Sequence, residues 1–183
     1  MNDIELKEVI ATVSTKVVHA VLGFLQNEQG VSLTDAISST AALAGAYLLD
    51  NAGIEMQGLS PGSPIEVKLV SDEGPKILTL MQEHAASLGL NPDTGWDTLI
   101  PPEAEPSSDP LELAYLLKPV VTSIFEEFSV PADLRTGLMA LTAVQFIFDG
   151  KDHLSPEIGK SLALTALIRG SHTVPLNPLA KFE

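Results

Sequence analysis

The 183-residue chain contains no cysteine. This absence excludes disulfides, thiolate catalysis, cysteine-ligated zinc and iron–sulfur clusters, and it fits a reducing compartment. Basic residues are also scarce, because ten lysines and arginines face 24 aspartates and glutamates, a formal net charge of −14. Such a charge repels phosphate backbones and anionic membrane surfaces. We therefore expect no nucleic acid and no membrane surface among the partners.

Long hydrophobic runs are missing too. No apolar run reaches the ~20 residues that a transmembrane helix needs, so we expect no membrane span. The chain begins with MNDIELKE, in which acidic residues come first and no apolar core follows a basic start, so no secretory signal is predicted. The sequence therefore predicts a soluble, cytoplasmic protein.

Two short segments, residues 38–50 and 136–149, are apolar nearly all the way round. A helix without a polar face has to be covered by other parts of the protein. Each segment follows an amphipathic stretch of similar length and is expected to pair with it. The pattern predicts an all-α fold of about six main helices in two loosely repeated halves, with orthogonal or bundle-like packing.

We expect these helices to form one compact unit over residues 1–183. Two pairs of stretches resemble each other loosely and suggest an internal repeat, although two helical hairpins under one packing rule would look similar. The expected parts are a first helical half (1–90), a proline-rich acidic connector (91–109), a second helical half (110–172) and an irregular tail (173–183).

Capping residues predict several helix boundaries. Ser32, followed by Asp35 in capping-box position, predicts one helix start. Asp109 followed by Pro110 predicts another, because proline is favoured in the first turn of a helix. Gly170 predicts the end of the last helix.

Residues 54–75 allow two interpretations. The stretch IEVKLV at 65–70 alternates apolar and charged residues, as a strand in a small hairpin would. Ser63, Pro64 and Glu66 also form a helix-start pattern. We favour a short helix that breaks at Gly74 and Pro75, and the alternative is an α+β fold with a small hairpin near 65–70.

Residues 91–110 hold five prolines, five acidic residues and the only tryptophan. Proline fixes φ and removes hydrogen-bond donors, so the segment is predicted to be an extended connector. We expect Trp96 and the pair Leu99 and Ile100 to pin this connector onto the body, because a tryptophan buries a large apolar area. The alternative is that these residues form an exposed motif for a partner.

Catalytic and cofactor motifs fail on inspection, so we expect no cofactor and no metal. GLSPG at 58–62 matches the nucleophile elbow, but the residue after Ser60 is Pro61, which has no N–H to hold an oxyanion. The four histidines lie in no metal-binding pattern. DGKDHL at 149–154 departs from a calcium loop, because its third position is lysine and its sixth is leucine. No glycine-rich nucleotide motif occurs.

The leading functional hypothesis is a non-enzymatic protein-interaction or self-assembly module, with a homodimer or another protein as the partner. Three segments, 36–49, 137–148 and 158–168, are nearly devoid of polar faces, and a third such helix calls for a covering surface. Ala42 and Ala46, with Gly45 in a parallel row, suit self-association, although we favour a tight contact inside the molecule.

Two other functions stay open. The small residues of the first apolar helix, facing Phe146 and Phe148 of the second, could enclose a cavity for a small apolar ligand. An enzyme with a dispersed site ranks last, because the sequence offers no nucleophile–base pair. For that case the residues to inspect are Glu73, Glu83 and His84.

Overall fold

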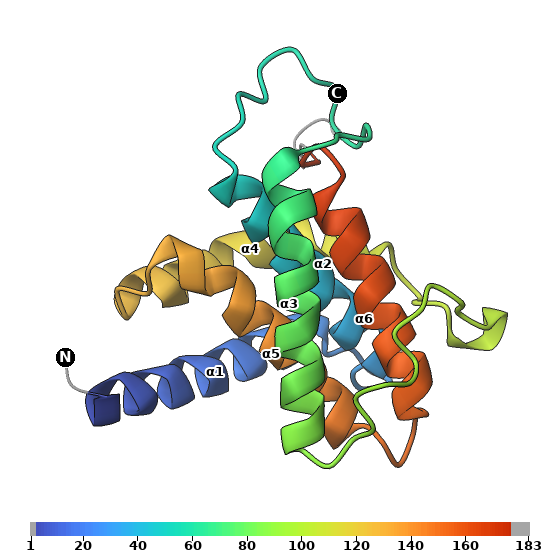
Figure 1. Ribbon diagram of the computed structural model, residues 1–183. Helices are drawn as coiled ribbons and strands as arrows, with labels where there is room; N and C mark the ends of the chain where they lie inside the picture. Colours follow the sequence, from blue (N-terminus) through green and yellow to red (C-terminus); the bar gives the residue numbers. More distant parts are fainter. Residues whose placement is uncertain (1–2, 177–183) are drawn as a thin grey trace.

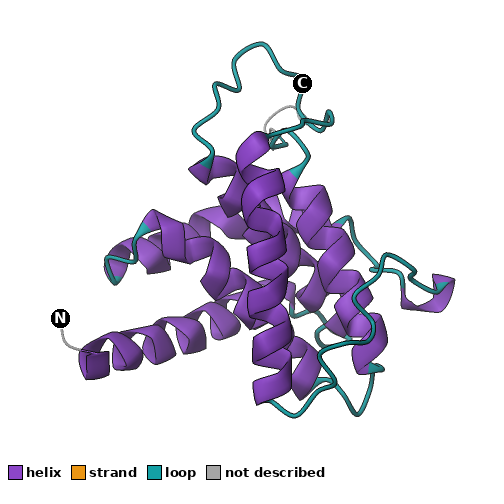
Figure 2. Ribbon diagram, in the orientation of Figure 1, coloured by secondary structure: helices purple, strands orange, loops and turns teal. Residues whose placement is uncertain are grey.

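The computed structural model describes residues 3–176, with side chains from Val9 onward, and every regular element in that range is helical (Figures 1 and 2). The all-α prediction is confirmed. No helix in the described range is both long enough and apolar enough to cross a bilayer. Residues 177–183 of the predicted tail lie outside it. The elements are α1 (Asp3–Leu25), α2 (Leu33–Asn51), α3 (Lys68–Ser87), a 3₁₀ turn η1 (Pro102–Ala104), α4 (Pro110–Glu127), α5 (Ala132–Asp149) and α6 (Pro156–Ser171).

Capping side chains start α2 and α4 where the sequence predicts. The Ser32 hydroxyl accepts a hydrogen bond from the Asp35 N–H (3.2 Å). The Asp109 carboxylate accepts one from the Leu111 N–H (2.9 Å). Both bonds satisfy N–H groups that the first helical turn leaves without an intrahelical partner. These two helix starts are therefore confirmed.

Helix α2 lies at the centre of the molecule, where α6, α5 and α4 pack around it (Figure 1). Fourteen of its 19 residues are buried. Because α2 has no polar face, burial on nearly every side is the arrangement that keeps its apolar side chains from water. The two apolar segments thus hide against each other and against α6, inside one chain.

The two predicted halves interlock instead of lying side by side. Helix α2 of the first half makes its largest contacts with α6 and α5 of the second, α3 packs on α5, and α1 packs on α4. Helices α2 and α6 run in the same direction, whereas α3 runs the opposite way (Figure 1). Neither half could therefore be removed without exposing the core of the other.

Two glycines set the close approach of α2 to α6. A Cβ atom added to Gly45 would overlap the backbone of Leu167 and Ser171, and one added to Gly170 would overlap the backbone of Ala42. The prediction that Gly170 ends the last helix is wrong, because α6 continues to Ser171. The lack of a side chain at Gly170 allows the close contact between α2 and α6 and is not required for a turn.

Residues 62–75 differ from both predictions. Residues 62–65 pair with 172–174, through bonds such as the Ile65 N–H to the His172 carbonyl (2.9 Å). This is an isolated bridge, and the described residues contain no sheet, so the α+β alternative is wrong. The expected short helix is also wrong, because α3 begins at Lys68 and runs through Gly74 and Pro75.

The reason that Pro75 does not break α3 lies in its exposure. A proline inside a helix removes the hydrogen bond to the carbonyl four residues earlier, here that of Ser71. Pro75 and Ser71 are both exposed, so water can satisfy that carbonyl. The local cost therefore stays small enough for packing of the rest of α3 on α5 to outweigh it.

Replacing Gly170 by alanine should lower the free energy of unfolding by about 1–3 kcal/mol, the usual cost of overpacking, although alanine is the better helix former. Gly23 in α1 has open space where a Cβ would lie. Gly23→Ala is the control and should change stability by less than about 1 kcal/mol, in the stabilising direction. Urea unfolding followed by circular dichroism measures both variants. Equal stability of the two would contradict the close helix contact.

Candidate functional site

The small residues predicted as an interface line an internal contact. Ala42 and Gly45 are buried where α2 meets α6, and Ala46 is half-buried at a small pocket of about 20 Å³ that Tyr115 also lines. Ala42 and Gly45 are therefore already covered within the molecule. Of these three residues, Ala46 is the one that is partly exposed.

The two phenylalanines that are predicted to face these small residues make other contacts. Phe146 is buried in the main core, and Phe148 is half-buried with the Lys151 ammonium 3.7 Å from its ring centre. Neither residue lines any of the four pockets described among residues 3–176. Those pockets thus place no cavity between the small residues of α2 and Phe146 or Phe148.

The sequence did not reveal a site at the connector, where side chains of α6 bind the first part of the connector. Lys160 is 0% exposed, and its ammonium donates to the backbone carbonyls of Asn91 (2.6 Å) and Thr94 (3.0 Å). Burial lowers the pKa of Lys160, and the nearby Glu157 carboxylate opposes this shift. A buried ammonium is costly unless its donors are satisfied, and here two carbonyls of the connector accept two of its three N–H groups.

We call the contact between Lys160 and the start of the connector the first clamp. Neighbouring residues strengthen it. The Ser161 hydroxyl oxygen lies 3.1 Å from the Gly95 carbonyl oxygen and 3.0 Å from Asp97 Oδ1. Gly95 has φ of +80°, and a Cβ there would meet the Glu157 backbone at 2.5 Å. Trp96 packs against the core and donates from its indole nitrogen to the Pro92 carbonyl (2.9 Å). Only glycine allows the connector to lie this close to α6.

A second clamp comes from α2. The Asp35 side chain is 6% exposed and accepts hydrogen bonds from the Ser107 hydroxyl and from the Ser108 N–H (3.2 Å). The sequence predicts a capping box here, and only its first half forms, because the Ser32 hydroxyl bonds the Asp35 N–H. The carboxylate instead binds donors that the connector brings from 72 residues away. The hydrogen-bond donors of the Asp35 carboxylate are determined by proximity in the folded chain, which no local sequence pattern indicates.

The buried polar side chains that bond the connector are Asp35, Lys160 and Ser161. Other buried hydroxyls in the described residues bond along their own helix, as Ser38 and Thr142 do, or have no partner, as Thr40 and Thr136 do. The hydroxyl of the buried Tyr47 links α2 to Thr122 of α4 (2.8 Å). The connector is therefore fixed at both ends by groups that are expensive to bury.

Residues 98–106 lie between the two clamps and form what we call the clamped loop. Ile100 is half-buried against the core and Ala104 is buried, whereas Leu99 is 80% exposed. The prediction that Trp96, Leu99 and Ile100 all pin the connector is thus confirmed for Trp96 and Ile100 and is wrong for Leu99. Alternation along the extended chain turns Leu99 outward when Ile100 points inward.

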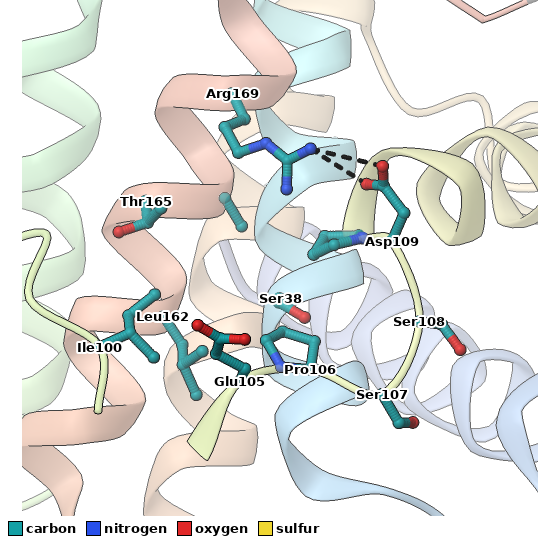
Figure 3. A pocket seen from close by; sticks show the side chains of 12 residues that line it. Ser38, Ile100, Glu105, Pro106, Ser107, Ser108, Asp109, Leu162, Thr165 and Arg169 are labelled. Atoms are coloured by element: carbon teal, nitrogen blue, oxygen red, sulfur yellow. Dashed lines mark hydrogen bonds and ion pairs between the residues drawn. The ribbon is translucent and has the colours of Figure 1, made fainter. Parts of the chain in front are cut away.

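A cleft of about 420 Å³ lies between the connector and α6, with Ser38 of α2 also in its lining (Figure 3). Arg169 and Asp109 line it too, and the Arg169 guanidinium bonds the Asp109 carboxylate at 3.2 and 3.4 Å. The remaining lining combines hydroxyls, apolar side chains and one further carboxylate, and it comprises Ile100, Glu105, Pro106, Ser107, Ser108, Pro110, Leu162, Thr165 and Ala166.

The residues suggested for an enzyme do not meet. Glu73 pairs with Lys76 (2.7 Å), whereas Glu83 and His84 lie about 15 Å further along α3, ten residues at the helical rise. The His84 ring nitrogen Nδ1 is 3.3 Å from the Ser87 hydroxyl, and burial lowers the pKa of His84. In the described part of the chain, no group of three or more histidines and carboxylates is placed to hold a metal ion.

No family model matches the chain, and no curated protein or solved structure matches it either. Function therefore has to be inferred from the side chains and their geometry. Two features stand out on that basis: the clamped loop with its exposed Leu99, and the cleft beneath the connector.

Replacing Lys160 by methionine removes the ammonium and keeps an unbranched side chain. We expect amide hydrogen exchange in residues 91–97 to accelerate by about tenfold, ~1.4 kcal/mol of local opening, because two carbonyls lose their donor. Lys151→Met is the control, since Lys151 contacts Phe148 and not the connector. Mass spectrometry of exchanged fragments measures both, and unchanged exchange in Lys160→Met would refute the clamp.

Proposed function

We propose that the chain is a non-enzymatic protein-binding module and that the clamped loop is the element it presents to its partner. The observation that carries this proposal is Leu99. It is 80% exposed, whereas the other exposed large hydrophobic side chains in the described range are 41–50% exposed. Full burial of a leucine is worth about 1.5–3 kcal/mol, which a partner's pocket could recover.

The clamps support this proposal because they remove the entropy cost of ordering a loop at the moment of binding. A proline-rich segment of this length would otherwise sample many conformations. Lys160 and Asp35 fix it before any partner arrives, and each immobilised side chain spared on binding is worth roughly 0.5–1.5 kcal/mol. Core positions normally hold uncharged side chains, so the buried charges of Lys160 and Asp35 depart from that preference. Such departures cluster at functional sites.

The partner could be another protein or a second copy of this chain. The apolar helices that motivate a homodimer cover one another inside the molecule, with α2 packed on α6 and α5. That arrangement weakens the case for a dimer through those helices. A dimer through the clamped loop stays compatible with it, and so does a different protein.

Replacing Leu99 by serine should reduce binding of the partner by about thirtyfold, the effect of a 2 kcal/mol hot spot. Quantitative mass spectrometry of proteins captured from a lysate on the immobilised chain measures this loss. Leu59→Ser is the control, since Leu59 is exposed in a different loop. The thermal unfolding of Leu99→Ser should match that of the parent, because the side chain is exposed.

Light scattering during size-exclusion chromatography measures the molar mass and so tests whether the partner is a second copy of the chain. If the partner is a second copy, the parent should show twice the 19.4 kDa chain mass and Leu99→Ser should show 19.4 kDa. A monomeric parent with no captured protein that depends on Leu99 would contradict the proposal.

A binder of a small apolar ligand is the second candidate, favoured by a different groove from the one the sequence suggests. A cavity of about 210 Å³ lies between α1, α3 and α5, beside the turn from α4 to α5. Its lining is almost wholly apolar and includes Val13, Leu80, Phe128 and Leu138. Pockets of this character take up hydrocarbon ligands.

Filling this groove tests the second candidate. Gly137 lines it, and a Cβ there would have its nearest neighbour at Leu80 Cδ2, 3.4 Å away, an ordinary contact. Native mass spectrometry of gently purified protein should show a bound apolar compound in the parent and in a Gly23→Leu control, and none in Gly137→Leu. A parent free of any bound compound would count against this function.

A further inference from the structure

We propose that the cleft beneath the connector is a binding site for a small organic cation, an ammonium or guanidinium group attached to an apolar body. This inference goes beyond the clamped loop and does not depend on Leu99. It concerns the cleft between the same connector and α6, which residues 105–110 help to line (Figure 3).

The cleft has the size of a ligand site and is held in shape by its surroundings. Its volume of about 420 Å³ falls within the roughly 300–1,000 Å³ typical of small-molecule sites. Asp35 fixes Ser107 and Ser108 on one wall, and α6, which carries Leu162 and Arg169, forms the other. A pocket whose walls are already fixed loses little entropy when a ligand enters.

The charges that line the cleft favour a cation. Three ionisable groups line it: Glu105, Asp109 and Arg169. Asp109 neutralises Arg169 through two contacts of 3.2 and 3.4 Å, whereas Glu105 has no ion-pair partner among the described residues. The lining therefore carries one uncompensated negative charge within a chain of net charge −14. Such a field concentrates cations in a concave site.

Two hydroxyl-bearing residues of the lining, Ser38 and Thr165, suit a ligand that only donates hydrogen bonds. Ser38 already donates its hydroxyl proton to the Thr34 carbonyl (2.6 Å), which leaves its oxygen free to accept. Thr165 Oγ1 is buried and has no hydrogen-bond partner. Ammonium and guanidinium groups offer several N–H donors and no acceptor, so hydroxyl and carboxylate oxygens match them.

Apolar side chains complete the lining and define the rest of the ligand. Ile100 and Pro106 come from the connector, and Leu162 and Ala166 come from α6. These groups would cover a hydrocarbon or aromatic body whose charged end lies at Glu105. A fully polar cation, such as a bare metal ion, would leave them without a contact.

An anion fits the same cleft poorly. The Asp109 carboxylate already neutralises Arg169, binding its Nη2 atom at 3.2 and 3.4 Å. An anion that approached the other guanidinium nitrogens would therefore lie beside two carboxylates, those of Asp109 and Glu105. The lining thus favours a cationic ligand over an anionic one, and an experiment can compare the two directly.

The probes are phenethylammonium and 3-phenylpropionate, which share an aromatic body and differ in the sign of their charge. Methyl-resolved NMR of the full chain follows Ile100, Leu162 and Ala166 as each probe is added to about 10 mM, sufficient to detect millimolar affinity. We expect saturable shifts of these methyl groups with the cation and none with the anion. Added salt should weaken the cation's binding, because the attraction is electrostatic.

Glu105→Gln keeps the size of the side chain and removes its charge, and Glu103→Gln does the same at an exposed neighbour outside the cleft. The dissociation constant of phenethylammonium should rise at least about fivefold in Glu105→Gln and stay within about twofold in Glu103→Gln. Equal effects of the two substitutions, equal binding of both probes, or no methyl shifts with the cation would each overturn the proposal.

Discussion

Two glycines, Gly45 on α2 and Gly170 on α6, let these helices approach until the backbone of one contacts the backbone of the other. That contact fixes how α6 lies along α2, and both clamps of the connector are built from this pair of helices. Asp35 stands in the first turn of α2, and Lys160 and Ser161 stand near the start of α6. Since the two helices run in the same direction, their first turns lie toward the same end of the molecule (Figure 1). A connector that lies along this end can reach both.

The way the connector is held follows from the cost of burying polar groups. Apart from the 3₁₀ turn η1, the connector has no helix or sheet to satisfy its carbonyls and N–H groups, because its prolines lack N–H donors. The body supplies substitutes: the Lys160 ammonium for the Asn91 and Thr94 carbonyls, and the Asp35 carboxylate for the Ser108 N–H. Each charge would be unfavourable in the core without the connector, and the connector would be unconstrained without the charges. The order of this segment and the burial of these charges are therefore mutually dependent.

The same arrangement gives the connector two different faces. Its outer face exposes Leu99, and its inner face walls the cleft that Glu105 and Arg169 line. A protein partner and a small cation would thus use opposite sides of one fixed segment. The apolar groove beside Phe128 is separate, because it lies among α1, α3 and α5 and uses none of these residues.

The sequence by itself determined the helical class, the starts of α2 and α4 and the burial of its two apolar segments. These follow from local signals, namely capping residues such as Ser32 and Asp109 and the absence of a polar face on α2. It did not determine the course of residues 62–75, since the continuity of α3 through Pro75 depends on which side of the helix meets water. Nor did it reveal the clamps: Lys160 and Asp35 look like ordinary surface and capping residues until folding brings partners from 66 to 73 positions away. Only the tertiary structure decided which polar groups are buried, and therefore which segment they hold, because such pairings depend on proximity across the fold and leave no periodic signal in the chain.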